Sequence, residues 1–169
     1  IKLFSYYDFT VTDAERGSRY GGNLRVHVTK GKGRPVSKNI AALLKLEGES
    51  GLNKKATYVK FAERAQKARL EFMDFLIKAN RSGKRVVGKS CPARSSTLLN
   101  YYGVDKELLP YLAEQSTSLK KGRYLPGKHI PVVDEKILFK EQPDYVVLTA
   151  WHYAKVIMER LKAEGLKSD

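Results

Sequence analysis

Residues 84–103, KRVVGKSCPARSSTLLNYYG, decide the fold class. The segment KRVVG, residues 84–88, predicts a short apolar strand, and the loop KSCPARSS follows it directly. Thr97–Tyr102 (TLLNYY) predicts a helix that ends at Gly103. A strand that passes through a loop into a helix is typical of a parallel α/β sheet.

The C-terminal part of the chain continues this pattern. Tyr145–Thr149 (YVVLT) is a nearly continuous apolar run, which is typical of a buried parallel strand. Leu108–Ala113 predicts another strand, which runs into a long loop, Glu114–Pro131. Lys136–Lys140 predicts a short helix or strand, and 151–163 a closing helix. These segments extend the parallel sheet.

A long amphipathic helix precedes the deciding stretch. Between Tyr58 and Asn80, apolar residues recur in steps of three and four, which places them on one helical face. These residues are Phe61, Ala65, Ala68, Phe72, Phe75 and Ala79. The opposite side carries Lys60, Arg64, Lys67 and Lys78, and Gly83 ends the helix.

The first third of the chain has a different pattern. Leu3–Thr12 is rich in β-branched and aromatic residues and predicts a strand, and Asn23–Thr29 alternates as a half-buried strand does. Ser37 is placed to cap a helix over 38–49. We therefore expect one domain over residues 1–169, with a β and short-helix appendage at 1–50 and a three-layer βα core at 51–169.

Composition sets limits on the class of protein. The chain has 169 residues, enough for about one domain, and 42% of them are hydrophobic, which excludes global disorder. No apolar run reaches the ~18–20 residues that a membrane-spanning helix needs. One cysteine forms no intrachain disulfide, and three scattered histidines predict no metal site. No signal peptide is visible, so we expect an excised piece of a cytoplasmic protein.

The net charge of +14 favours anionic partners. Residues 53–94 alone carry 12 Lys or Arg against 3 Asp or Glu, a balance of +9. This window is either a solvated helix face or a binding surface. Two functions fit the charge without any enzyme: a basic nucleic-acid-binding domain, and a free-standing module that binds a nucleotide or coenzyme.

The strongest candidate site is Lys89–Asn100, between a predicted parallel strand and its helix. Ligands of open α/β sheets bind there, and a helix N-terminus favours phosphate. Lys89 and Arg94 add positive charge, and three residues from Ser95 to Thr97 add hydroxyl groups. Neither the Walker pattern nor GxGxxG is present. The alternative is a capping turn with surface cations.

Two further segments are candidates. The loop KKGRYLPGKHIP, residues 120–131, would place Arg123 and His129 near the strand ends, and long ordered loops are often functional. In RYGGNLR, residues 19–25, paired glycines allow close approach of the backbone to a ligand. The alternatives are a plain crossover loop and a tight turn.

Four segments in order resemble one known family. They are YGGNLRV, VVGKSCPARSSTLLNYYGV, SLKKGRYLPGKHIPV and PDYVVLTAWHY, and together they resemble the C-terminal domain of the SAM-dependent sugar C-methyltransferases. The resemblance implies a Rossmann-like α/β domain that binds and orients a nucleotide-linked sugar or a similar phosphorylated substrate. It implies S-adenosylmethionine and structural zinc in upstream domains of a parent enzyme, and no cofactor and no methyl transfer in this fragment alone.

The residues and the resemblance together predict the site. Tyr20 stands where the family carries a histidine proposed as the base. A phenol with a pKa near ~10 is a poor base unless a cation lowers that pKa, so Tyr20 either acts as the base or only positions substrate, or the base comes from elsewhere. The predicted substrate-binding residues are Gly21, Gly22, Asn23, Arg25, Lys89, Ser90, Pro92, Ala93, Arg94, Ser95, Ser96, Thr97, Asn100, Lys120, Arg123, Pro126, Gly127, His129, Trp151 and His152.

Overall fold

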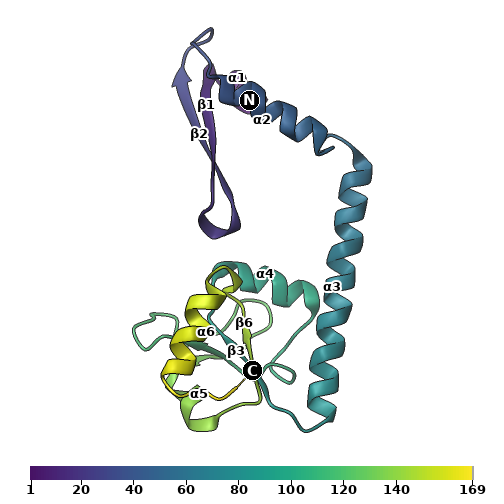
Figure 1. The fold of residues 1–169 in the computed structure, drawn as a ribbon, viewed down its shortest axis with the longest axis vertical. Helices are drawn as coiled ribbons and strands as arrows, with labels where there is room; N and C mark the ends of the chain where they lie inside the picture. The colour runs from purple at the N-terminus through teal and green to yellow at the C-terminus, as the bar shows by residue number, and fades with distance from the viewer. Residues whose placement is uncertain (169) are drawn as a thin grey trace. The chain divides into compact units, whose positions relative to one another are not determined.

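A computed structural model describes residues 1–168. The chain divides into two compact units, one formed by Ile1–Arg64 and the other beginning at Ala65. Figure 1 shows a hairpin with short helices at the N-terminal end and a helix-covered sheet at the C-terminal end. Each unit is described separately below.

The first unit is a hairpin packed on a helix. Strand β1 (Phe9–Gly17) pairs antiparallel with β2 (Asn23–Lys30), and the 3-10 turn η1 (Arg19–Gly21) joins them. Helix α2 (Lys38–Glu49) follows. The small core consists of Val11, Ala14 and Ile40, with Phe4 and Leu43 against it. This core fixes β1 on α2.

Two expectations for this unit are wrong. Helix α1 (Lys2–Tyr6) occupies the first half of the predicted strand Leu3–Thr12, because pairing with β2 begins only at Phe9. The alternation in β2 predicts a half-buried strand, yet all eight of its residues are exposed. Helix α2 covers the β1 side of the hairpin, so the apolar row of Leu24, Val26 and Val28 meets no core.

The second unit is a parallel sheet. Its strands are β3 (Val86–Lys89), β4 (Leu112–Glu114), β5 (Val132–Asp134) and β6 (Tyr145–Leu148). They lie in the order β5-β4-β3-β6, and every pair is parallel. The helices are α3 (Lys55–Arg81), which begins in the first unit, α4 (Ala93–Tyr102), α5 (Lys136–Glu141) and α6 (Ala154–Ala163) after the turn η2 (Trp151–Tyr153).

Helices cover both faces of this sheet. One core joins Leu76 of α3 and Leu99 of α4 to the sheet. The other joins Leu138 of α5 and Leu161 of α6 to Val87 of β3. Because the two sets of helices lie on opposite faces, the unit has three layers, and the α/β fold class with an N-terminal β appendage is confirmed.

Several boundaries differ from the predictions. Helix α4 begins at Ala93, a full turn earlier than predicted, because Pro92 provides an extended N-cap. Strand β4 begins at Leu112, not at Leu108. Strand β5 has only three residues and was not predicted. Across the described residues, no helix is long and apolar enough to cross a membrane.

Candidate functional site

The carboxyl ends of the four parallel strands lie at one edge of the sheet. Lys89 ends β3, Glu114 ends β4, Asp134 ends β5 and Leu148 ends β6. Ligands of open α/β sheets bind outside this edge. Most of the predicted site residues of the second unit follow these strands or begin the helix after β3.

Lys89 faces the protein interior. Its side chain is 2% exposed, and its Nζ lies 3.0 Å from Glu135 Oε2 and donates to the Ala113 carbonyl at 3.2 Å. Arg160 donates to both oxygens of Glu135, at 3.2 and 2.6 Å. Burial opposes the charged carboxylate, but hydrogen bonds from Arg160 and Lys89 outweigh it and lower the pKa of Glu135. Lys89 thus belongs to a buried ion network.

The loop after β3 is held by its neighbours. Ser90 has a φ of 73°, in the left-handed region. Its carbonyl accepts from Thr149 Oγ1 at 2.6 Å, which joins the ends of β3 and β6. The Cys91 amide donates to Glu114 Oε1 at 2.7 Å, and the Cys91 carbonyl accepts from Lys120 Nζ at 2.6 Å. Lys120 therefore fastens the 120–131 loop to this turn.

Helix α4 holds the same loop at a second point. Asn100 Nδ2 donates to the Pro126 carbonyl at 2.9 Å, and Ser96 Oγ donates to it at 3.2 Å. Gly127 has a φ of 88°, and a Cβ there would lie 2.1 Å from Asn100 Oδ1. Ser95 is buried, and its hydroxyl donates to the Pro92 carbonyl at 2.6 Å. These contacts show that four residues predicted to bind substrate stabilise the fold: Ser95, Ser96, Asn100 and Gly127.

An exposed group of side chains remains at the end of β3 and β6. The Trp151 side chain is 63% exposed, and its ring centroid lies 3.4 Å from that of His152. His152 Nε2 is shielded from solvent and has no hydrogen-bond partner among residues 1–168. Burial lowers the pKa of His152, and the charge of Arg94 lowers it further. The three residues therefore form a cationic and aromatic surface with a neutral imidazole.

The other predicted residues of this unit lie on or just before α4 and in the 120–131 loop. Ala93 and Thr97 lie on the first turns of α4, and Pro92 is half-buried before it. Arg123 and His129 belong to the 120–131 loop. His129 adopts a φ of 51° and its amide donates to the Leu125 carbonyl within that loop, where a short bridge between two of its residues, Tyr124 and Pro131, closes the turn.

The remaining predicted residues belong to the first unit. Tyr20 lies in the η1 turn with φ 59°, and Gly21 and Gly22 follow with φ of 82° and 122°. The Arg19 guanidinium lies 5.2 Å from the centre of the Tyr20 ring. Arg25 forms an ion pair with Glu15 at 3.0 Å. Positive φ is ordinary for the two glycines, so only Tyr20 is held in a conformation that other residues rarely adopt.

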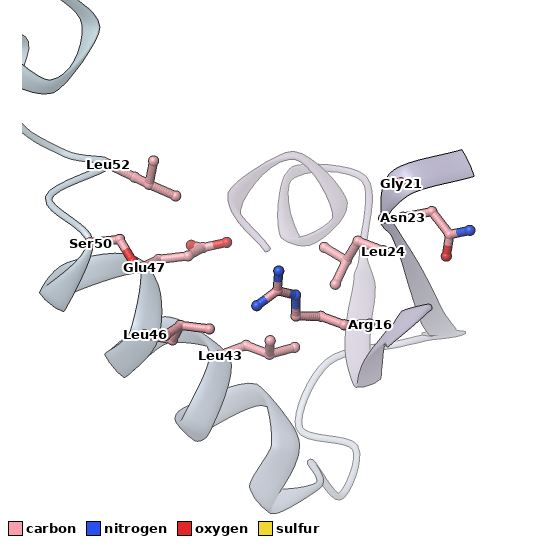
Figure 2. A pocket seen from close by; sticks show the side chains of 10 residues that line it. Arg16, Gly21, Asn23, Leu24, Leu43, Leu46, Glu47, Ser50 and Leu52 are labelled. Carbon is pink, nitrogen blue, oxygen red and sulfur yellow. The ribbon is translucent and has the colours of Figure 1, made fainter. Parts of the chain in front are cut away.

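This turn borders a pocket of about 460 Å³ between the hairpin and α2. Figure 2 shows Arg16 of β1 and Glu47 of α2 pointing toward one another across it, with leucines around them. The lining residues are Arg16, Gly21, Gly22, Asn23, Leu24, Leu43, Leu46, Glu47, Ser50 and Leu52. Sequence reasoning missed Arg16 and Glu47, because only the hairpin register brings Arg16 opposite Leu24 and toward α2.

Metal ligands are not grouped in the part of the chain that the structure describes. Residues 1–168 contain no cluster of three or more His, Cys, Asp or Glu side chains arranged to hold a metal ion.

Comparison with known proteins gives two matches. Residues 18–167 match the family described as the C-methyltransferase C-terminal domain. The C-methyltransferase NovU of Streptomyces niveus is 29% identical over 161 residues, which is 95% of this chain and 38% of that protein. The chain therefore spans 38% of the length of this relative. The family match confirms the resemblance carried by the four sequence motifs.

Proposed function

Because the chain belongs to the C-methyltransferase C-terminal domain family, we propose that it binds and orients the phosphorylated substrate of such an enzyme, a nucleotide-linked sugar. One observation carries this proposal: Arg94, an exposed Trp151 and the N-terminus of α4 lie at the carboxyl edge of the sheet. Each part of this surface suits one part of a nucleotide.

The diphosphate is proposed to lie at the start of α4. Amides of the first helical turn and the helix dipole favour an anion, and Arg94 adds a full charge beside them. The exposed ring of Trp151 offers a stacking face for a nucleobase. His152 stays neutral beside the ring of Trp151, because burial and the charge of Arg94 lower its pKa.

In the complete enzyme, binding here would contribute orientation. A ligand held through its nucleotide presents its sugar in a fixed position, which converts a bimolecular step into an effectively unimolecular one. We propose that residues 20–25 of the first unit also contribute to substrate binding, with Tyr20 as a positioning residue. In this proposal residues 1–169 act as one functional domain.

The methyl donor expected in the parent enzyme is S-adenosylmethionine, which supplies an electrophilic methyl group. The loop after β3 does not fit an adenosyl cofactor of the dinucleotide-binding kind. It has no glycine, and its Cys91 amide is already bound by Glu114. We therefore assign the donor site, and the expected zinc site, to other parts of the parent enzyme.

Calorimetric titration with a nucleoside diphosphate and its sugar conjugate tests the proposal. We expect Arg94→Ala to weaken binding about 10-fold, and Lys140→Ala, a cation on α5, to leave it unchanged. Raising the salt concentration from about 50 to about 300 mM should weaken binding several-fold. A fall of several orders of magnitude, with equal binding of any single strand, would instead identify a nucleic-acid-binding surface.

A further inference from the structure

Thr149, the residue directly after β6, holds the loop that follows β3. It is buried, and its Oγ1 lies 2.6 Å from the Ser90 carbonyl oxygen and 3.2 Å from the Lys89 carbonyl oxygen, which both accept from it. The Thr149 amide also donates to the Lys89 carbonyl, at 3.1 Å. One buried residue therefore binds this loop through both its main chain and its side chain.

The two residues joined by this hydroxyl each lead into one part of the proposed nucleotide site. Ser90 comes three residues before Ala93, where α4 begins. Thr149 comes two residues before Trp151, where η2 begins. The start of α4 is the proposed site for the diphosphate, and the Trp151 ring is the proposed stacking face for the base. The bond from Thr149 to Ser90 therefore connects the segments that carry these two parts.

The turn at Ser90 depends on contacts from its neighbours. Its φ of 73° is a conformation that residues other than glycine rarely adopt, so surrounding contacts must hold it. The Ser90 amide donates to the Ala113 carbonyl at 2.9 Å, and the Cys91 amide donates to Glu114 at 2.7 Å. These two bonds attach the loop to β4, which lies on one side of β3, whereas β6 lies on the other. Thr149 attaches the loop on the β6 side, and Trp151 follows on that side.

We propose that Thr149 is a positioning residue, which fixes the start of α4 relative to Trp151 so that one nucleotide reaches both. This inference rests on the proposed function. A ligand that spans two subsites gains affinity from their connection only while the spacing of the subsites matches its own groups. Without the Thr149 hydroxyl, each part of the site still binds its own half of the ligand. The advantage of joining the two halves in one molecule is then reduced.

A double-mutant cycle with nucleoside diphosphates tests this proposal. The diphosphates of adenosine, guanosine, cytidine, uridine and thymidine are titrated into the chain, and the one that binds wild type most tightly becomes the probe. Thr149→Val and Thr149→Ala both remove the hydroxyl, and we expect each to weaken binding of the probe about 10-fold. When Trp151→Ala is already present, the same two substitutions should weaken it by less than about 2-fold. A residue that only stabilised the fold would weaken binding equally in both backgrounds.

Two variants and a second probe serve as controls. Thr149→Ser keeps the hydroxyl and should bind the probe within about 2-fold of wild type. Ser116→Ala removes another hydroxyl near this edge of the sheet, one that donates to Asp134 at 2.9 Å, and should leave binding unchanged. Inorganic pyrophosphate meets only the α4 part of the site, so the Thr149 variants should bind it within about 2-fold of wild type. Circular dichroism checks folding, and either Thr149→Val or Thr149→Ala is sufficient for the test.

The outcomes separate this inference from the proposed function. If the probe binds wild type and loss of the Thr149 hydroxyl leaves its affinity unchanged, Thr149 does not position the site. Equal losses with and without Trp151→Ala, or an equal loss for pyrophosphate, would also overturn the inference. If none of the five diphosphates binds the wild-type chain, the proposed function itself fails.

Discussion

Gly127 lies where a side chain has no room. A Cβ would come within 2.1 Å of Asn100 Oδ1, and the φ of 88° disfavours any L residue. We expect Gly127→Ala to lower the free energy of unfolding by about 1–3 kcal/mol and to detach the 120–131 loop from α4. Urea denaturation measures the change.

Gly122→Ala is the control for that prediction. Its φ is 76°, but nothing lies within 4 Å of the position that the alanine methyl group would take. The difference between the two variants therefore reports the clash with Asn100 apart from backbone strain. Equal losses of stability would show that the contact between Asn100 and the loop contributes nothing.

Single residues also show where sequence reasoning stops. The order of KSCPARSS between strand and helix predicts a site at the edge of the sheet, and the structure places Arg94 there. It does not predict that Lys89 is buried against Glu135, because the two are distant in sequence and only the fold pairs them. The sequence motif likewise singles out Arg25, but in the paired hairpin Arg16 lines the pocket and Arg25 does not.

At the scale of elements, the buried network of Lys89, Glu135 and Arg160 joins β3 to the start of α5 and to α6. Removing the Glu135 charge leaves the buried Lys89 ammonium without its carboxylate partner, whereas Arg160 keeps its ion pair with Glu164. We expect Glu135→Gln to destabilise the protein by about 3–5 kcal/mol. Lys89→Met, which leaves Glu135 with Arg160, should cost less. Thermal and urea denaturation compare the two, and a larger loss for Lys89→Met would contradict this assignment.

The junction of β5 and α5 responds to acid. Asp134 accepts from the Lys136 amide, Lys121 and Ser116, and these bonds lower its pKa from 3.8 to about 2. Because the pKa is lower in the folded state, this stabilisation is complete above about pH 4 and is lost as the pH falls toward about 2.

Urea midpoints between about pH 2 and about pH 7 test this pH dependence. The wild type should lose stability between about pH 4 and about pH 2, and Asp134→Asn should reduce this loss. Asp74→Asn, on an exposed face of α3, is the control and should keep the wild-type profile. An unchanged profile for Asp134→Asn would mean that the capping bonds do not stabilise the fold.

The sequence predicts the long helices with a clear apolar period, but it does not predict the shortest elements. Helix α2 has the predicted bounds, and α3 extends the predicted range by a few residues, since apolar spacing and end signals agree in both. Strand β5 has three residues, too few for a pattern, and it forms because β4 offers a partner. Residues Lys2–Tyr6 have strand-forming side chains but no strand to pair with, so they form a helix.

At the scale of the whole molecule, the α/β class and the family followed from the order of motifs along the chain. The role of each motif residue could not be predicted in this way, because contacts between distant segments decide which residues stabilise the fold and which stay exposed. Lys120, Ser96 and Asn100 fasten loops, whereas Arg94 and Trp151 lie at the edge proposed to meet a ligand. The charge of +14 contributes attraction to anions but does not select among them.

The most direct test of the account is a backbone-amide NMR titration of the chain with a nucleoside diphosphate. We expect saturable shifts concentrated at Ala93–Ser96 and Trp151–His152, with the amides along Lys55–Arg69 unmoved. Saturable shifts spread along Lys55–Arg69, with α4 and η2 silent, would contradict a phosphate site at the carboxyl edge of the sheet.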